Sequence, residues 1–410
     1  MRKTNFCLPL IGIVLMAMAL PTEATSLKVL HEFKGDPDGA NPVAGLTFDT
    51  AGNLYGTTTA GGAGLGTVFK LTPSSDGTWT EKVLYRFKGG RDGANPYAGL
   101  IFDGAGNLYG TTANGGSAKC GGCGTVFKLA PNSNGGWTES VLYRFLGGSD
   151  GFAPSGLIFD AAGKNLYGTT VYGGNVCNGS PGCGIVFKLA SNRNGSWTER
   201  VLYAFKSNGV DGTQPVAPLT FDIAGNLYGT TSTGGQSETC SSCGTIFKLT
   251  PNSGGSWTES VLYSFTGLGD GQYPQGELIL DTAGNLYGTN IASENNGGGA
   301  VFKLDTNGGL SVVKHPGTYV YAGLVFDPEG NLYGTTVSTG PLGGGGGVVF
   351  KLTPRSGGGW TNNVVHAFVG KPAQHSWANL VLDKAGNLYG TTKDCGKGET
   401  CQGVVFEISP

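Results

Sequence analysis

Short apolar and β-branched runs, separated by glycine-rich turns, recur along almost the whole chain. In one copy of the pattern they cover residues 99–103, 107–112, 124–129 and 137–145. Each run is bounded by Gly, Asn, Asp or Pro, as β-strands are. No segment after the first 24 residues shows an uninterrupted helical period. The pattern therefore predicts four strands in each copy.

The second run of each copy carries the phrase G-N-L-Y-G-T or a one-residue variant of it, seven times in all. Successive copies are 46 to 61 residues apart. A unit of this length cannot bury an apolar face alone, so the copies must pack on one another. Four antiparallel strands repeated seven times predict an all-β protein, a seven-bladed β-propeller. The asparagines of the seven copies are Asn53, Asn107, Asn165, Asn226, Asn285, Asn331 and Asn387.

The lengths of the connections indicate where each blade begins. A tight D-x-x-G-N turn joins the first two runs, whereas the longer connection after residue 145 is expected to cross to the next blade. Residues 27–33 match the fourth, outer run but precede the first inner strand, and the last copy, 379–408, lacks an outer run. We therefore expect the N-terminal strand to complete the last blade and close the ring, so that no edge stays open.

The turn between the third and fourth runs sets a register for the outer hairpin. If Thr250 lies opposite Trp257, Lys248 lies opposite Glu259. Opposite charges directly across a ladder help to fix the register. The same count predicts the pairs Lys70–Glu81, Lys128–Glu139 and Lys188–Glu199, and places Lys351 opposite Asn362.

Residues 1–24 have the features of a secretory signal peptide. Arg2 and Lys3 precede an apolar run over residues 6–20, and Ala24 offers a small residue for cleavage. An uncleaved anchor is the alternative, whereas Cys7 lies too far upstream of the cut for a lipoprotein signal. The propeller then covers residues 25–410. We expect a secreted or periplasmic protein with no membrane insertion after cleavage.

Charge excludes two classes of partner. Only 13% of the residues are charged, and the net charge is −2. Nucleic-acid binding needs a basic stripe that neutralises phosphates, and a polybasic lipid-binding patch needs similar charge. Neither is present in the sequence. We expect no nucleic-acid partner, and we expect a monomer.

Eight cysteines remain after removal of residues 1–24, all between second and third strands. An even number in an exported chain predicts disulfides, here within single loops. A zinc site from two C-x-x-C pairs is an alternative, but those pairs belong to blades two apart. A thioredoxin-like redox role would need a helix start that the sequence lacks. No metal or cofactor is assigned, and the expected pairs are Cys120–Cys123, Cys177–Cys183, Cys240–Cys243 and Cys395–Cys401.

Repeated aspartates are the first candidate binding residues. Five crossovers contain D-G-x-x-P, and a ring of these carboxylates could bind calcium or the hydroxyls of a sugar. Alternatively, each Asp caps its own turn, as expected for the Asp that closes each inner strand. Asp38 has the same pattern, and the candidates are Asp92, Asp150, Asp211 and Asp270.

The sixth crossover departs from the repeat and provides the second set of candidates, His375 and Trp377. Trp377 is the one tryptophan off the repeated position. Polar and aromatic residues that depart from a repeat on a loop face indicate a binding site, although a single loop can also drift. His31 and His366 occupy positions held by Tyr in other outer strands and are interpreted as packing residues. No nucleophile elbow, H-E-x-x-H, phosphate loop or dinucleotide fingerprint appears, so no catalytic residue is assigned.

The repeated G-N-L-Y-G-T-T, followed by G-G and G-T-V-F-K-L, resembles the Gloeo-Verruco (GloVer-type) tandem repeat of secreted bacterial proteins. The resemblance covers residues 27–410 and implies export but no particular activity. In that family the C-terminal anchor varies, and the chain stops at Pro410 after its last strand, so we expect no anchor. The inner and second strands also resemble NHL-type propeller blades, which implies the fold alone.

These observations favour a secreted binding module for a neutral, hydroxyl-rich extracellular polymer such as a polysaccharide. Equivalent sites in several blades would provide avidity. Two alternatives are a carbohydrate-active enzyme, a polysaccharide lyase or glycosidase, with its site on the loop face, and a surface scaffold that binds protein.

Overall fold

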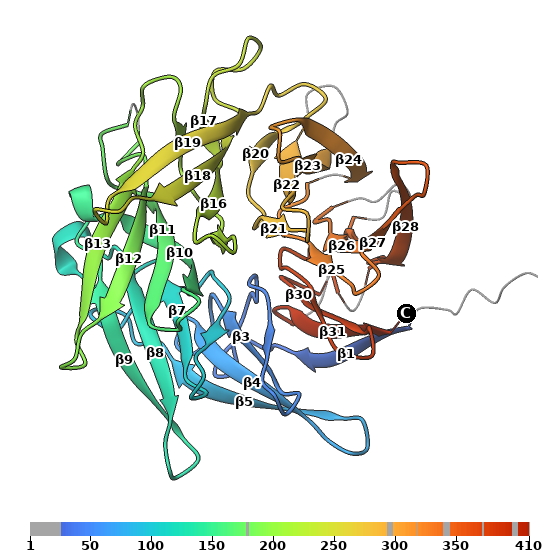
Figure 1. Cartoon of the computed structure of the whole chain (residues 1–410). Helices are drawn as coiled ribbons and strands as arrows, with labels where there is room; N and C mark the ends of the chain where they lie inside the picture. Colours follow the sequence, from blue (N-terminus) through green and yellow to red (C-terminus); the bar gives the residue numbers. More distant parts are fainter. Residues whose placement is uncertain are drawn as a thin grey trace, which may run out of the picture.

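Seven antiparallel sheets of four or five strands are arranged around a central axis, like the blades of a propeller (Figure 1). The computed structural model describes residues 26–177, 180–292, 298–317, 319–338, 345–370, 373–395 and 401–409. The predicted signal peptide, residues 1–24, lies outside this part of the chain. The seven-bladed, all-β fold predicted from the repeats is confirmed.

Blades 1 to 3 follow one another in the sequence, and each runs from a strand at the axis to a strand at the periphery. Blade 1 contains β2 (Thr47–Phe48), β3 (Leu54–Thr58), β4 (Thr67–Pro73) and β5 (Trp79–Arg86). Blade 2 contains β6 (Ile101–Phe102), β7 (Leu108–Thr112), β8 (Thr125–Pro131) and β9 (Trp137–Arg144). Blade 3 contains β10 (Phe152–Phe159), β11 (Asn165–Tyr172), β12 (Ile185–Ser191) and β13 (Trp197–Ala204).

Blades 4 to 6 repeat this order with small additions. Blade 4 contains β15 (Thr220–Phe221), β16 (Leu227–Thr231), β18 (Thr245–Pro251) and β19 (Trp257–Ser264), beside the small pair β14 (Gly212–Thr213) and β17 (Thr233–Gly234). Blade 5 contains β20 (Gln272–Pro274), β21 (Ile279–Leu280), β22 (Leu286–Ala292), β23 (Gly299–Leu304) and β24 (Leu310–Gly317). Blade 6 contains β25 (Val325–Phe326), β26 (Leu332–Thr335), β27 (Val348–Pro354) and β28 (Trp360–Ala367).

The two ends of the chain meet in blade 7. Its strands are β29 (Val381–Leu382), β30 (Leu388–Thr392), β31 (Val404–Ser409) and, outermost, β1 (Ser26–Glu32). In Figure 1 the blue β1 lies beside the red β31, and the antiparallel register runs from Ser26 opposite Ser409 to Glu32 opposite Val404. The predicted closure of the ring by the N-terminal strand is therefore confirmed.

Helical structure is limited to short turns in the described residues. Two 3₁₀ turns lie in connections, and none of the described helices is long and apolar enough to cross a membrane. The turns are η1 (Ala118–Cys120) and η2 (Gly148–Asp150).

The repeated phrase encodes a hydrogen-bonded turn at the start of each second strand. In blade 2 the carboxylate of Asp103 accepts bonds from the backbone N–H and the side-chain amide of Asn107, and from the Tyr109 hydroxyl at 3.0 Å. The Asn-to-Asp side-chain bond occurs in all seven blades, at 2.5–2.8 Å. The predicted role of these aspartates as turn formers is confirmed.

The second glycine of the phrase makes room for an aromatic ring. Gly110 lies directly opposite Phe127 in the ladder, and a Cβ at Gly110 would be 2.6 Å from the Phe127 ring. The following threonine bonds to the next blade: the Thr111 hydroxyl donates to the Ser155 carbonyl at 2.9 Å. Thr57 and Thr289 make corresponding contacts. The residues of the phrase described here therefore serve to build the blades and to join them in the ring.

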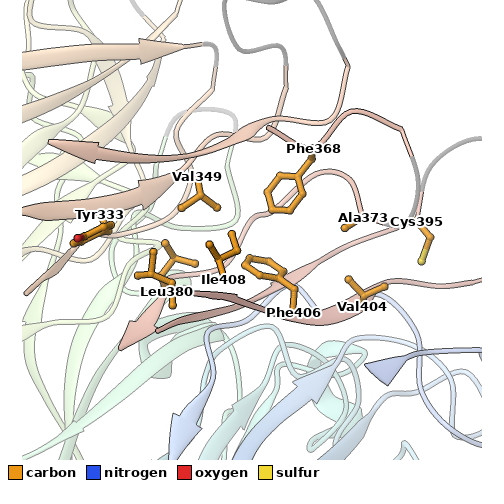
Figure 2. Packing of buried hydrophobic residues seen from close by; sticks show 10 residues of the cluster. Tyr333, Val349, Phe368, Ala373, Leu380, Cys395, Val404, Phe406 and Ile408 are labelled. Carbon is orange, nitrogen blue, oxygen red and sulfur yellow. The ribbon is translucent and has the colours of Figure 1, made fainter. Parts of the chain in front are cut away.

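The hydrophobic core is divided among the interfaces between neighbouring blades. Figure 2 shows one of them, where Tyr333, Val349 and Phe368 of blade 6 pack against Phe406 and Ile408 of blade 7. The rings of Phe368 and Phe406 meet edge to face, with centroids 5.3 Å apart. Because each blade buries one face on each neighbour, no blade has a core of its own.

The predicted Lys–Glu pairs are wrong by one residue. Pro251, not Thr250, lies opposite Trp257, so Lys248 faces Ser260 and Glu259 faces Leu249. The same shift occurs in the hairpins of blades 1, 2, 3 and 6. Since the side-chain period of a strand is two, this moves each glutamate to the opposite face of its blade. The lysines lie instead over tyrosine rings of the second strand, as Lys70 does over Tyr55 at 5.5 Å.

Candidate functional site

Seven equivalent residues, one from each blade, form a ring around the central axis. Each directly precedes the Leu that leads into an inner strand. Six of the seven line two cavities of about 270 and 280 Å³, and each cavity is lined from all seven blades, so both lie on the axis. The ring therefore lies between the two cavities. The cavity of about 270 Å³ is called the outer cavity, and the cavity of about 280 Å³ is called the inner cavity. The members of the ring are Gly45, Gly99, Gly156, Pro218, Glu277, Gly323 and Asn379.

Small residues allow the segments of the ring to come close together. A Cβ at Gly99 would be 3.2 Å from the Gly45 carbonyl oxygen, and a Cβ at Gly156 would be 2.5 Å from the Pro218 ring. In blades 5 and 7 this position carries a polar side chain instead. Only Glu277 and Asn379 therefore offer functional groups in this ring.

Glu277 and Asn379 form a hydrogen-bonded network across three blades. The Asn379 amide donates to a Glu277 carboxylate oxygen at 3.2 Å, and the Asn379 carbonyl oxygen accepts from the Gly323 N–H at 2.5 Å. Burial raises the pKa of Glu277 to about 7. The carboxyl group, half-buried at the channel, is therefore present in both protonation states near neutral pH.

An aromatic pair lines the outer cavity. The rings of Trp377 and Tyr321 stack with centroids 4.5 Å apart and planes 18° apart, and both line the cavity. Lys393 lies over the Trp377 ring at 5.1 Å. Tyr97, which is 58% exposed, lines the same cavity from blade 2. Tryptophan and tyrosine faces of this kind are suited to contacts with flat, partly apolar ligands.

His375, the other off-pattern candidate, does not line this cavity. Its imidazole Nδ1 lies 2.9 Å from an Asp394 carboxylate oxygen, and its backbone φ is 58°. The equivalent residue has a positive φ in every blade, for example Asn95 in blade 2 and Gln214 in blade 4. His375 thus occupies a repeated backbone position, and the structure brings only Trp377 to the channel.

The four candidate aspartates lie away from Trp377, in the grooves between outer strands. The Tyr85 hydroxyl donates to Asp92 at 2.7 Å, and the Lys88 N–H donates to the same carboxylate. Asp150, Asp211 and Asp270 accept corresponding bonds from Tyr143, Tyr203 and Tyr263. Each carboxylate therefore caps its own crossover, and the four do not converge on one ligand site.

A glutamate of the next outer strand lies near the aspartate in each of four such grooves, although the hairpin count predicts a lysine opposite each glutamate. Each has a carboxylate oxygen that is buried without a hydrogen-bond partner among the described residues. Burial first, and a neighbouring aspartate second, raises the pKa of each to about 7. The sequence signal for these glutamates is a recurring W-T-E phrase that follows a D-G-x-x-P crossover. The residues are Glu81, Glu139, Glu199 and Glu259.

The eight cysteines of the described residues form the four predicted local disulfides. Each joins two points of one loop between a second and a third strand. Because these cysteines are bonded in disulfides, they have no free thiolate to bind zinc. Disulfides of this kind are typical of proteins in oxidising compartments.

Comparison with solved structures finds neighbours of low sequence identity. A luciferin-regenerating enzyme is 12% identical with a TM-score of 0.49, and the match covers 94% of this chain and 95% of that one. A puromycin hydrolase mutant is 11% identical with a TM-score of 0.54, covering 88% of this chain and 51% of that one, so this chain spans about half its length. A protein of unknown function from Dyadobacter fermentans is 10% identical with a TM-score of 0.44, covering 94% and 100%. At 11% identity the likeness to the puromycin hydrolase concerns the fold alone.

Sequence comparison gives the family. No curated protein matches the chain. The Gloeobacter/Verrucomicrobia repeat matches three overlapping segments, residues 15–180, 83–267 and 172–406, which together span nearly the whole chain. The protein therefore belongs to the Gloeobacter/Verrucomicrobia repeat family.

Proposed function

We propose that this protein is an exported binding module for an extracellular polysaccharide, and that the sugar chain binds at the channel mouth. The observation that carries the proposal is the stacked pair of Trp377 and Tyr321 beside a cavity with Glu277 and Asn379 at its base. An aromatic face and hydrogen-bonding groups behind it suit the apolar face and the hydroxyls of a sugar ring. The low charge of the chain favours a neutral polymer over a polyanion.

Binding is favoured over glycoside hydrolysis by the number of carboxylates. Glycosidases generally use two carboxyl groups on opposite sides of the scissile bond. Among the described residues that line the two cavities, Glu277 is the only one with a carboxyl group. A retaining or inverting pair is therefore lacking at this site.

A second candidate function rests on Glu277 itself. A carboxyl group with a pKa of about 7 is suited to proton transfer near neutral pH. A carbohydrate-active enzyme such as a lyase needs one such group to abstract a proton from its substrate. This alternative is separated from binding by whether products are released.

The test incubates the purified protein with a panel of soluble and insoluble polysaccharides and scores both retention and released oligosaccharides. For a polysaccharide that is retained, Trp377→Ala should raise the Kd about fivefold or more, because truncation of a central aromatic anchor commonly costs more than about 1 kcal/mol. Val216→Ala, at the equivalent position of blade 4, is the matched control and should leave the Kd within about twofold.

Each outcome has a separate meaning. If the protein retains none of the polysaccharides, or if Trp377→Ala binds like the unaltered protein while its Tm is unchanged, the proposed site is wrong. Released oligosaccharides would instead support the enzyme, and Glu277→Gln should then abolish release but keep retention. Retention of a protein ligand alone would favour a surface scaffold. A monomer in solution is part of the proposal and is checked by light scattering.

A further inference from the structure

The seam between blades 7 and 1, where the ring closes, contains a group of side chains that no other groove has in full among the described residues. His31 lies on β1, Asp38 lies in the crossover from β1 to blade 1, and Glu81 lies on β5. The two strands belong to neighbouring blades, 7 and 1, and lie side by side at the periphery. The group therefore spans the junction between the N-terminal strand and the first complete blade.

The geometry brings three donor atoms to one point. His31 Nε2 is 3.2 Å from each Asp38 carboxylate oxygen, and a ligand atom from each of His31, Asp38 and Glu81 lies within 4.8 Å of the other two. The His31 and Asp38 side chains are 21% and 18% exposed. Glu81 Oε1 is buried and has no hydrogen-bond partner among the described residues, so this oxygen has a free lone pair.

The equivalent grooves show what is particular to the seam. Between blades 1 and 2 the corresponding residues are Tyr85, Asp92 and Glu139, and the Tyr85 hydroxyl donates to Asp92. Burial and this carboxylate raise the pKa of Tyr85, so the phenol stays protonated and is not a metal ligand. An imidazole in the same place offers a nitrogen lone pair instead. His366 has this position in blade 6, but Leu27 lies where the glutamate would be.

We propose that His31, Asp38 and Glu81 bind a divalent transition-metal ion such as Zn²⁺ across the closing seam of the ring. One nitrogen and two carboxylate oxygens are a donor set that zinc accepts, whereas calcium and magnesium prefer oxygen alone. The two carboxylates balance the charge of the ion. Three protein ligands leave one position of a tetrahedron for water.

Two basic residues, Arg86 and Lys34, lie beside the group of His31, Asp38 and Glu81. Arg86 acts on Glu81 electrostatically, while its Nε donates to the Pro37 carbonyl at 3.0 Å. The backbone N–H of Lys34 donates to Asp38, which fixes the orientation of that carboxylate. The ion would tie β1 to β5 in addition to the ladder between β1 and β31, and so would strengthen the closure of the ring.

The test titrates tag-free, metal-free protein with ZnCl₂ by isothermal titration calorimetry, with CaCl₂ and MgCl₂ in parallel. We expect zinc to bind at the seam, with a rise in Tm, and little response to the other two ions. His31→Tyr installs the residue that four other outer strands carry, so it should fold, and it should weaken this zinc binding at least about tenfold, since loss of a supporting contact alone costs 10–100-fold. His366→Tyr is the matched control and should keep the zinc response.

Glu81→Gln provides a second variant, because it keeps the shape of the side chain and removes the charge. It should also weaken zinc binding, while its metal-free Tm does not fall. Cobalt(II) in place of zinc should give visible absorption typical of a tetrahedral site, lost in His31→Tyr. The proposal is overturned if zinc neither binds nor raises the Tm, or if His31→Tyr retains the same affinity, stoichiometry and cobalt spectrum.

Discussion

The second strands and the channel ring are both sevenfold features, yet their chemistry differs. At the second strands every blade repeats the same bond between an Asn amide and an Asp carboxylate. At the channel ring five blades contribute Gly or Pro, and only Glu277 and Asn379 bring polar side chains. The repeated positions build the ring, and the departures from the repeat provide groups that a ligand can use.

The difference teaches where function is to be sought in a repeat protein. A position that is the same in all blades is constrained by contacts that every blade needs, such as the close approach of Gly110 to Phe127. A position at the axis has no partner that all blades share, so one blade can change without loss of the fold. Substitutions at the second strands should therefore lower stability, whereas those at the channel should change binding.

The largest effect is expected from Gly110→Val in blade 2. The new side chain would overlap the Phe127 ring, whose nearest atom is 2.6 Å from the Cβ position. Overpacking of a tight core should lower the free energy of unfolding by about 3 kcal/mol. Chemical denaturation measures this change. Gly104→Val is the control, since no atom lies within 4 Å of a Cβ there, and an equal loss in both variants would refute the packing argument.

A smaller effect is expected from Asp103→Ala. The change leaves the Asn107 amide and the Tyr109 hydroxyl without their acceptor, which should cost about 2 kcal/mol. Although burial alone would raise it, the bonds from Asn107 hold the pKa of Asp103 below its usual range. The stabilisation is therefore present above pH 4 and lost as the pH falls further. An Asp103→Ala protein with unchanged denaturation midpoints at pH 7 would contradict this role.

The smallest effect concerns the groove glutamates. Their folded pKa of about 7 exceeds the unfolded value near 4.5, so the folded state binds more protons between these values and stability falls as the pH rises through this window. The slope for one group is at most about 1.4 kcal/mol per pH unit, and solvent screening reduces it. Glu139→Gln should therefore flatten the fall in stability between pH 5 and pH 8 by about 1 kcal/mol.

The measurement is the denaturation midpoint at several pH values, and Asn362→Gln in blade 6 is the control because it changes a neutral residue at the equivalent strand position. A Glu139→Gln protein whose pH profile matches that of the unaltered chain would show that this carboxyl group is solvated in the folded state. Trp377→Ala removes no titratable group near neutral pH, so it should leave the pH profile unchanged.

Much of the fold could be predicted because its signals are local. Spacing of the G-N-L-Y-G-T phrase gave the number of blades, and the unmatched run at residues 27–33 gave the closure later seen between β1 and β31. The cysteine pairs are close in sequence, so their bonds followed from loop length. The register of the outer hairpin was missed because its turn is one residue shorter than the count assumed, and a shift of one residue reverses the side to which every side chain points.

The sequence by itself determined the blade, the number of copies, the ring and the disulfides, since each depends on residues within one repeat or on the order of repeats. Only the tertiary structure decided which residues meet across blades: Trp377 with Tyr321, Asn379 with Glu277, and His31 with Glu81. These partners are 50 to 102 residues apart. Their contact is set by the angle between neighbouring blades and by the width of the channel, which no single repeat encodes.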